Sequence, residues 1–314
     1  MRAPILLSAA VALMLGGCAT STGPAATSPS STTVSESPSA VPVNVDKLLI
    51  VVLENHSLDQ VLSSMPYVAS LATDYAYATH YTATRHPSLP NYLAIAGGST
   101  FGVTDDVGPG GHRIRGTSIF GQALAAGRTA AVYAEGMTAN CQTSNQGHYA
   151  VRHNPWAYFV DERDLCKQFD VPFDQLAGDV AAGALPSVGM VIPDVCNDAH
   201  DCTLATADAW YQGVLPSVLA GPDFQSGRLV VVLTADEDDR KHANKVLTVV
   251  LQQGGVKGVV TAPLTHYSLS RLCSEIVGAP ALRKGLTAQS MSDAFLISVS
   301  RALSRVGQLA RGGT

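Results

Sequence analysis

The segment KLLIVVLEN, residues 47–55, decides the fold class of this chain. Residues 48–53 are all aliphatic, and the run ends abruptly in Glu54 and Asn55. A continuous apolar run without polar alternation is typical of a parallel strand that is buried on both faces of its sheet. Similar runs recur along the chain at residues 129–136, 187–194, 228–239 and 246–253.

Segments with apolar residues at helical spacing lie between these runs. They span residues 57–75, 117–127, 206–221 and 266–280, and a further helix is expected over residues 89–98, with Ser88 near its N-cap. Strands that alternate with helices predict an α/β fold, a three-layer sandwich with a largely parallel central sheet.

Composition narrows the classes of function. The chain has 314 residues, of which 46% are hydrophobic and 14% charged, enough for one sizeable core. The formal net charge is -5, and lysine and arginine do not cluster, so we expect no nucleic-acid partner. The sequence shows no internal repeat and no glycine-rich dinucleotide fingerprint.

The first 43 residues have the pattern of an export signal and a tether. Residues 1–18 combine a positive start with an apolar stretch and end in LGGC, which resembles the bacterial lipobox, so that Cys18 is expected to carry lipid and to anchor the protein to a membrane. An ordinary signal peptide, with Cys18 incidental, is the alternative. Residues 19–43 are rich in serine, threonine and proline and predict a flexible linker. The catalytic domain is expected over residues 44–314.

Five further cysteines follow Cys18. Export favours disulfides, and we expect Cys196 and Cys202 to close a short polar loop and Cys141 to pair with Cys166. Cys273 lies in an apolar helical pattern and is expected to be a buried free thiol. A metal–thiolate site is the rival interpretation, but no Cys-x-x-Cys spacing supports it.

Acidic and amide residues follow three of the predicted strands. These are Glu54-Asn55, Asp194 and the run Asp236 to Asp239. Ligands of open α/β sheets bind beyond the carboxyl ends of the strands, so these oxygen-bearing side chains are expected at one edge. Hard divalent cations prefer oxygen ligands, and the sequence therefore predicts a divalent metal ion of open identity.

The stretch RHPSLPNYLAIAGG, residues 85–98, places Ser88 at the mouth of a predicted helix. Proline is tolerated in the first helical turn, so Pro90 does not argue against the helix. A hydroxyl at this position faces unsatisfied N–H groups and the positive end of the helix dipole, a setting that suits a nucleophile and a phosphate dianion. A plain helix cap is the structural alternative.

Six blocks occur in the order seen in the bacterial phosphoesterase family. They are VVLENHSLD, RHPSLPNYLAIAGGSTFGVTDD, YAEGM, YAVRHNPWAYF, VIPDVCNDAHD and LTADEDD. The chain resembles this family, which contains acid phosphatases and phospholipase C-like enzymes, and most closely its secreted mycobacterial-type acid phosphatases. The resemblance implies an alkaline-phosphatase-like fold.

The resemblance also implies residue roles. Ser88 matches the nucleophile, which also ligates the metal, and His200 matches a histidine needed for activity. The other implied metal ligands are Glu54, Asn55, Asp236 and Glu237, and Asn91 and His153 are expected to contact substrate. Structural alternatives are a solvated strand end at Glu54-Asn55, an acidic turn at Asp236 to Asp239, loop support at His200 and packing beside Trp156 at His153.

The leading hypothesis is metal-dependent hydrolysis of phosphomonoesters through a phosphoserine intermediate. A phospholipase C-like phosphodiesterase on the same fold is the first alternative, because a lipid anchor would bring phospholipid head groups within reach. A non-catalytic surface lipoprotein that binds phosphorylated ligands is the second. The expected location is the cell envelope or the exterior.

Overall fold

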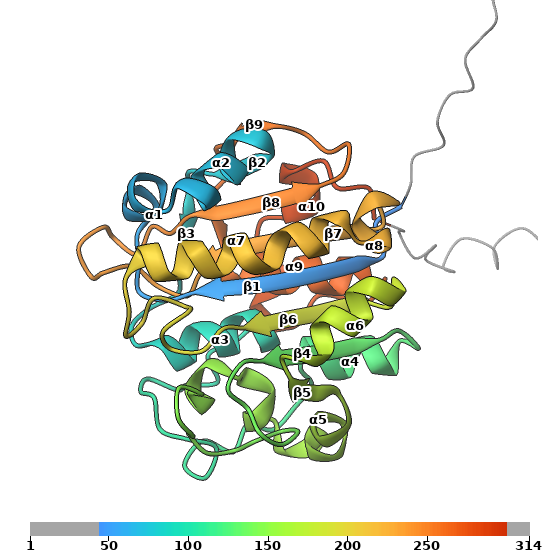
Figure 1. The fold of residues 1–314 in the computed structure, drawn as a ribbon. Coiled ribbons are helices and arrows are strands. Elements are labelled where there is room, and N and C mark those ends of the chain that lie inside the picture. Colours follow the sequence, from blue (N-terminus) through green and yellow to red (C-terminus); the bar gives the residue numbers. More distant parts are fainter. Residues whose placement is uncertain (1–43, 300–314) are drawn as a thin grey trace, which may run out of the picture. The chain divides into compact units, whose positions relative to one another are not determined.

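The apolar run after residue 46 forms strand β1 (Lys47–Leu53), and all seven of its residues are buried. In the computed structural model, which describes residues 44–299, β1 lies inside an eight-stranded sheet of order β5-β4-β6-β1-β7-β8-β2-β9 (Figure 1). The other strands are β2 (Ala76–Ala78), β4 (Ala130–Ala134), β5 (Asp170–Pro172), β6 (Val188–Ile192), β7 (Leu229–Ala235), β8 (Thr248–Gln252) and β9 (Gly258–Val260). The predicted segments 1–18 and 19–43, with Cys18, lie outside the described residues.

The sheet is mixed and mostly parallel, as the buried apolar runs predict. The strands from β5 to β7 run parallel to their neighbours, whereas β8 runs antiparallel to both β7 and β2. Strands β3 (Tyr81–Thr82) and β10 (Leu264–Thr265) form a separate parallel pair.

Helices cover both faces of the sheet, which confirms the three-layer α/β architecture. One layer contains α1 (Leu58–Ser64), α2 (Pro66–Asp74), α6 (Gln175–Ala182), α7 (Leu204–Ala220) and α8 (Pro222–Gln225). The other contains α3 (Ser88–Gly97), α4 (Ile119–Ala125), α9 (His266–Ile276) and α10 (Met291–Ala294). In Figure 1, α7 crosses in front of the sheet and α9 lies behind it. No helix among residues 44–299 combines the length and apolar character needed to cross a membrane.

Shorter elements flank the β4–β5 edge. They are α5 (Arg163–Phe169) and the 3-10 turns η1 (Val151–His153), η2 (Pro155–Tyr158) and η3 (Val160–Glu162), while η4 (Arg283–Leu286) packs beside α9.

One predicted helix is interrupted. The pattern over residues 57–75 predicts a single helix, but the structure divides it into α1 and α2 at Met65 and Pro66. Met65 has φ -121° and ψ 81°, outside the helical region. Steric conflict with the proline ring disfavours helical geometry at the preceding residue, so Pro66 begins a new helix instead of continuing the first one.

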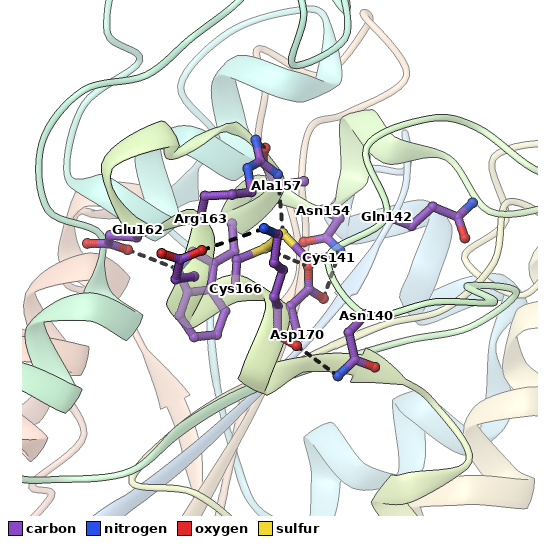
Figure 2. The surroundings of a disulfide bond; sticks show 12 residues. Asn140, Cys141, Gln142, Asn154, Ala157, Glu162, Arg163, Cys166 and Asp170 are labelled. Atoms are coloured by element: carbon purple, nitrogen blue, oxygen red, sulfur yellow. Dashed lines mark hydrogen bonds and ion pairs between the residues drawn. A yellow bond between two sulfur atoms is a disulfide. The ribbon is translucent and has the colours of Figure 1, made fainter.

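Both expected disulfides are present, and so is the buried free thiol of Cys273. The Cys141–Cys166 bridge ties the loop after β4 to α5, and Figure 2 shows its surroundings. Cys196–Cys202 closes the loop between β6 and α7. Because both bridges fasten loops at the carboxyl edge of the sheet, they restrict the part of the fold where ligands of α/β proteins bind.

A buried carboxyl lies next to the first bridge. Asn154 donates from Nδ2 to both carboxyl oxygens of Asp170, each at 2.9 Å, and also to the hydroxyl of Tyr149 at 3.1 Å (Figure 2). Burial raises the pKa of Asp170 to about 7, although the hydrogen bond from Asn154 and the charge of Arg163 lower it.

We predict that Asp170 makes stability depend on pH. An unfolded aspartate has a pKa of about 3.9, so between about pH 4 and pH 7 the folded protein holds a proton that the unfolded chain has lost. The contribution of Asp170 is therefore complete below this window and declines as the pH rises through it, by at most about 1.4 kcal/mol per pH unit. Urea unfolding at pH 5 and pH 7 should show a weaker decline in Asp170→Asn than in the wild type. The exposed Asp164→Asn control should keep the wild-type slope, and equal slopes in all three proteins would contradict the prediction.

Candidate active site

The site begins where β1 and β7 end. These strands are paired in parallel with Leu53 opposite Ala235, so the next residues, Glu54 and Asp236, emerge side by side. The Asp236 N–H donates to the Leu53 carbonyl at 2.9 Å, and the Asn55 N–H donates to Oδ1 of Asp236 at 3.0 Å. Both carboxylates are fully buried. The strand register itself therefore brings two acidic side chains together.

Ser88 joins this pair from helix α3. Pro87 occupies the N-cap position, Ser88 is the first helical residue, and its side chain makes no capping hydrogen bond. The hydroxyl instead donates to Oε2 of Glu54 at 2.9 Å, and Tyr92, one turn later, donates to Oε1 of Glu54 at 2.6 Å. The plain-cap interpretation of Ser88 thus fails, because its hydroxyl points into the acidic cluster and away from the helix amides.

The loop before α3 is held by Asn91. Its Oδ1 accepts the N–H groups of Thr84 and Arg85 at 3.0 and 3.1 Å, and its Nδ2 donates to Oε2 of Glu237 at 2.9 Å. Asn91 is fully buried. Protein groups engage the amide on both sides, which gives Asn91 a positioning role, and its expected contact with substrate stays a prediction.

His86 supports Glu237 from the same loop. Its Nδ1 lies 2.7 Å from Oε1 of Glu237, and its Nε2 lies 3.0 Å from Oδ1 of Asp238. Asp238 also accepts three backbone N–H groups from its own loop, at Arg240, His242 and Asn244. Two of the acids in the 236–239 run thus have different tasks: Glu237 faces the cluster, and Asp238 shapes the turn beside it.

A histidine and an aspartate complete the cluster opposite Ser88. His153, in η1, is buried and stacks on Tyr92 with ring centroids 5.2 Å apart. Its Nε2 lies 3.4 Å from Oε1 of Glu54, and its Nδ1 lies 3.0 Å from Oδ2 of Asp198. Burial lowers the pKa of His153, and the neighbouring Arg152 lowers it further. A neutral imidazole thus presents a nitrogen beside Glu54, and the expected contact of His153 with substrate stays a prediction.

His200 lies at the rim with its side chain 29% exposed. Its Nδ1 is 2.6 Å from Oδ1 of Asp201, and its Nε2 is 3.0 Å from a guanidinium nitrogen of Arg152. A guanidinium only donates, so Nε2 is the acceptor and the ring proton resides on Nδ1. His200 in this arrangement must take up a proton at Nε2 before it can act there as an acid.

The cluster has the electrostatics of a cation site. Four carboxyls gather here with no lysine or arginine ion pair to any of them within residues 44–299: Glu54, Asp198, Asp236 and Glu237. Burial raises the pKa of each, and the charge of Asp236 raises those of Glu54 and Glu237 further. Oδ2 of Asp236 is buried without a hydrogen bond, and both ring nitrogens of His153 are buried with carboxylate oxygens as their polar neighbours.

Buried, unpaired acceptors of like charge fit a divalent cation. The oxygens of Glu54, Ser88 and Asp236 meet as the sequence predicts, and Glu54, His153 and His200 form a second group of donor atoms within 4.8 Å of one another. The acidic residues Asp194 and Asp239 are not in the cluster. Asp194 accepts the N–H groups of Cys196 and Asn197 within its loop, and Asp239 pairs with His242 on the surface.

Two residues of the acidic cluster, Tyr92 and Asp198, are not predicted from the sequence. Tyr92 lies one helical turn after Ser88, and helical spacing alone places it on the same side of α3. Asp198 lies between the two cysteines of the second disulfide, in a loop whose course the sequence does not give.

Comparison with known proteins identifies related sequences. The Phosphoesterase family model matches residues 62–298, a range that contains every site residue except Glu54 and Asn55. The chain is 32% identical over 251 residues to a phosphatidylinositol-3-phosphatase of Mycobacterium tuberculosis, which covers 78% of this chain and 81% of that protein. It is 28% identical over 232 residues to a phosphate-repressible acid phosphatase of Penicillium chrysogenum, covering 68% of this chain and 55% of the fungal one.

Solved structures show the same fold at low sequence identity. A protein of the alkaline phosphatase superfamily from Vibrio parahaemolyticus superposes with a TM-score of 0.54 and 10% identity, over 81% of this chain and 72% of that chain. The lipoteichoic acid synthase LtaP of Listeria monocytogenes gives a TM-score of 0.54 at 11% identity, over 78% and 76%. The expected alkaline-phosphatase-like architecture is thereby confirmed.

We predict that a divalent cation stabilises the fold through this cluster. Addition of Mg²⁺, Ca²⁺ or Zn²⁺ to chelator-treated protein should raise the melting temperature, by the equivalent of about 2.7 kcal/mol when the ion is at 100 times its Kd. Asp236→Asn should be more stable than the wild type without metal at neutral pH, because it removes a buried like charge, and should lose most of the metal-induced shift.

The exposed-turn variant Asp239→Asn serves as the control and should respond to metal as the wild type does. Melting curves with and without chelator measure both effects. A metal-induced shift of equal size in Asp236→Asn and the wild type would show that the ion binds elsewhere.

Proposed function

This chain belongs to the phosphoesterase family and is a phosphoric ester hydrolase, and we propose that it cleaves phosphomonoesters through a phosphoserine intermediate on Ser88. One observation carries the proposal. Ser88 is the first residue of α3, a helix that is buried along its whole length. Its hydroxyl donates to the buried carboxylate of Glu54, which lies within a cluster of acids at the carboxyl edge of the parallel strands. Pro87 holds the N-cap position, so the Ser88 hydroxyl is not used as a helix cap.

The proposed reaction has two displacements. In the first, Oγ of Ser88 bonds to phosphorus, the bond to the ester oxygen breaks, and the alcohol leaves with the proton that the serine has lost. In the second, water attacks the phosphoserine, the P–Oγ bond breaks, and Ser88 regains a proton as phosphate departs. The protons balance within each step, so the protein needs a group that holds a proton only transiently.

Five residues are proposed to hold a divalent metal ion, and all carry oxygen donors: Glu54, Asn55, Ser88, Asp236 and Glu237. When bound, such an ion lowers the pKa of a coordinated hydroxyl and neutralises charge that develops on phosphoryl oxygens. Asn91 and His86 hold Glu237 in place through the contacts described above. Metal identity is left open.

The substrate class follows from the relatives. The named activities of the mycobacterial and fungal relatives are phosphatase activities, and one acts on a phosphoinositide. The chain covers about half of the fungal proteins, so the mycobacterial one, covered over 81% of its length, supports the proposal best. We therefore propose small phosphomonoesters or phosphoinositide head groups as substrates, in an acid phosphatase type of reaction.

We also propose that the protein is exported. The two disulfides favour an oxidising compartment. Lipidation at Cys18 and attachment to a membrane remain predictions from the sequence.

We predict that Ser88→Ala loses at least about 10³-fold in kcat toward an aryl phosphate, because the covalent intermediate cannot form. Ser290→Ala is the matched control, since Ser290 caps α10 and donates to Glu275. It should lose only about 1 kcal/mol of stability and keep its turnover. Initial-rate kinetics and thermal unfolding of both variants test this, and near-normal kcat in Ser88→Ala would refute the phosphoserine mechanism.

A substrate panel separates the proposal from its two alternatives. We predict that p-nitrophenyl phosphate and a short-chain phosphatidylinositol 3-phosphate are hydrolysed with kcat/KM at least about tenfold above bis-p-nitrophenyl phosphate and phosphatidylcholine. The measurement is phosphate release or chromophore release by the soluble domain with metal supplied. Preference for the diesters would favour the phospholipase C-like alternative, and phosphate binding without any turnover would favour the binding lipoprotein.

A further inference from the structure

We propose that Arg152 binds the phosphoryl group of the substrate, and that His200 holds its guanidinium in readiness until the substrate arrives. The inference deepens the proposed function and rests on it. Its starting point is the 3.0 Å contact between Arg152 and Nε2 of His200, which joins a charged donor to a neutral ring.

Arg152 is a cation that makes no ion pair among residues 44–299, although its charge lowers the pKa values of the nearby Asp198 and Asp201. Its side chain is half-buried in η1, and among residues 44–299 no carboxylate lies within ion-pair distance of it. Other buried or half-buried cations are engaged by the protein. Lys47 pairs with Asp223 and Arg271 with Glu275, while Arg163 and Arg283 donate to backbone carbonyls. A guanidinium that is partly removed from water and lacks a counter-ion favours an anion from solution.

Arg152 lies on the same side of the fold as Ser88, and His200 and Glu54 connect the two. One ring nitrogen of His200, the residue whose Nε2 accepts from Arg152, lies within 4.8 Å of a Glu54 oxygen and of a His153 nitrogen. The same carboxylate accepts from the Ser88 hydroxyl through Oε2. The guanidinium is thus adjacent to the carboxylate that contacts the nucleophile, on the side where His153 and His200 lie.

The phosphoryl group of the substrate needs a positive group beside the acidic cluster. A phosphomonoester brings up to two negative charges to a cluster of four buried carboxyls. A cation bound there would already be surrounded by these acids, so the charge of the substrate needs a further positive group. Arginine presents a planar fork of donors that matches two phosphoryl oxygens, and charge-assisted hydrogen bonds of this kind are stronger than a bond to a neutral imidazole. Phosphate is therefore the better acceptor, and it takes Arg152 away from His200.

The movement of Arg152 from His200 to the phosphate changes what His200 can do. When the guanidinium moves, the lone pair on Nε2 of His200 becomes free, while Asp201 keeps the proton on Nδ1. Nε2 then accepts a proton from the water that attacks the phosphoserine. The water oxygen bonds to phosphorus, the P–Oγ bond breaks, and His200 returns the proton to Oγ of Ser88 as phosphate leaves.

The chain holds Arg152 from both sides. The preceding Val151 N–H is bound by Asn145 at 2.9 Å, and His153 is fixed between Glu54 and Asp198. Asn154, two residues on, is anchored to Asp170 beside the Cys141–Cys166 bridge (Figure 2). The backbone at Arg152 is thus restrained, and only the long side chain needs to move.

The experiment compares Arg152→Ala and Arg152→Lys with the wild type. We expect Arg152→Ala to lose about 10²–10³-fold in kcat/KM toward p-nitrophenyl phosphate, and the Ki of inorganic phosphate to rise at least about tenfold. Arg152→Lys should fall between, because lysine keeps the charge without the fork. Guanidinium chloride at millimolar concentration should restore part of the activity of Arg152→Ala and leave the wild type unchanged.

Arg128→Ala is the matched control for net charge, since Arg128 is exposed just before β4, at the opposite edge of the sheet. It should leave kcat/KM and the phosphate Ki within about twofold of the wild type. An unchanged phosphate Ki in folded Arg152→Ala or Arg152→Lys overturns the inference, as does a loss of activity that guanidinium does not relieve. Failure of the proposed function is distinguishable, because then the wild type itself does not turn over or Ser88→Ala stays active.

Discussion

The arrangement of the site follows from one constraint: the sheet brings buried carboxyl groups together, and their charges repel one another. Parallel pairing of β1 with β7 sets Glu54 beside Asp236, and neither can withdraw, because each continues a strand that is buried along its whole length. Charges buried in this way are costly unless a cation, a proton or hydrogen bonds compensate them. Ser88, Tyr92 and Asn55 supply hydrogen bonds, whereas Oδ2 of Asp236 has none, and the proposed divalent ion would compensate it.

This repulsion also explains why the surrounding polar groups are arranged as they are. Glu237 is held by Asn91 and His86, Glu54 by Tyr92, and His153 by Asp198. Each of these three side chains is thus oriented by a polar neighbour. Outer contacts of this kind fix the direction of metal ligands in proteins and tune their basicity. The energy for holding the acids comes from the core beneath them, since β1, β6 and β7 are buried at every residue.

The sequence predicted those features that follow from periodicity and strand ends. The apolar runs gave the layers, and the residues after 47–53 and 229–235 gave the acids of the site, because strand polarity puts them at one edge. The division between α1 and α2 was also within reach, since Pro66 disfavours a helical Met65. Asp198, Arg152 and the positioning role of Asn91 were not, because they depend on how loops without periodicity fold over the edge. A quoted block such as YAVRHNPWAYF contains Arg152, but only the contact with His200 reveals an unpaired charge.

The two disulfides have different relations to this site. Cys196–Cys202 encloses Asp198 and His200 in one short loop. Glu135 fastens this region by accepting from the Asn197 side-chain amide and from the Asp194 N–H just before the loop. Cys141–Cys166 lies further away and acts through Asp170 and Asn154 on the segment of Arg152 and His153. His200 and Arg152 thus reach their 3.0 Å contact from two independently fastened loops. Because each loop is closed by its own covalent bond, the contact can be exchanged for a phosphate by side-chain movement alone, without loosening either support.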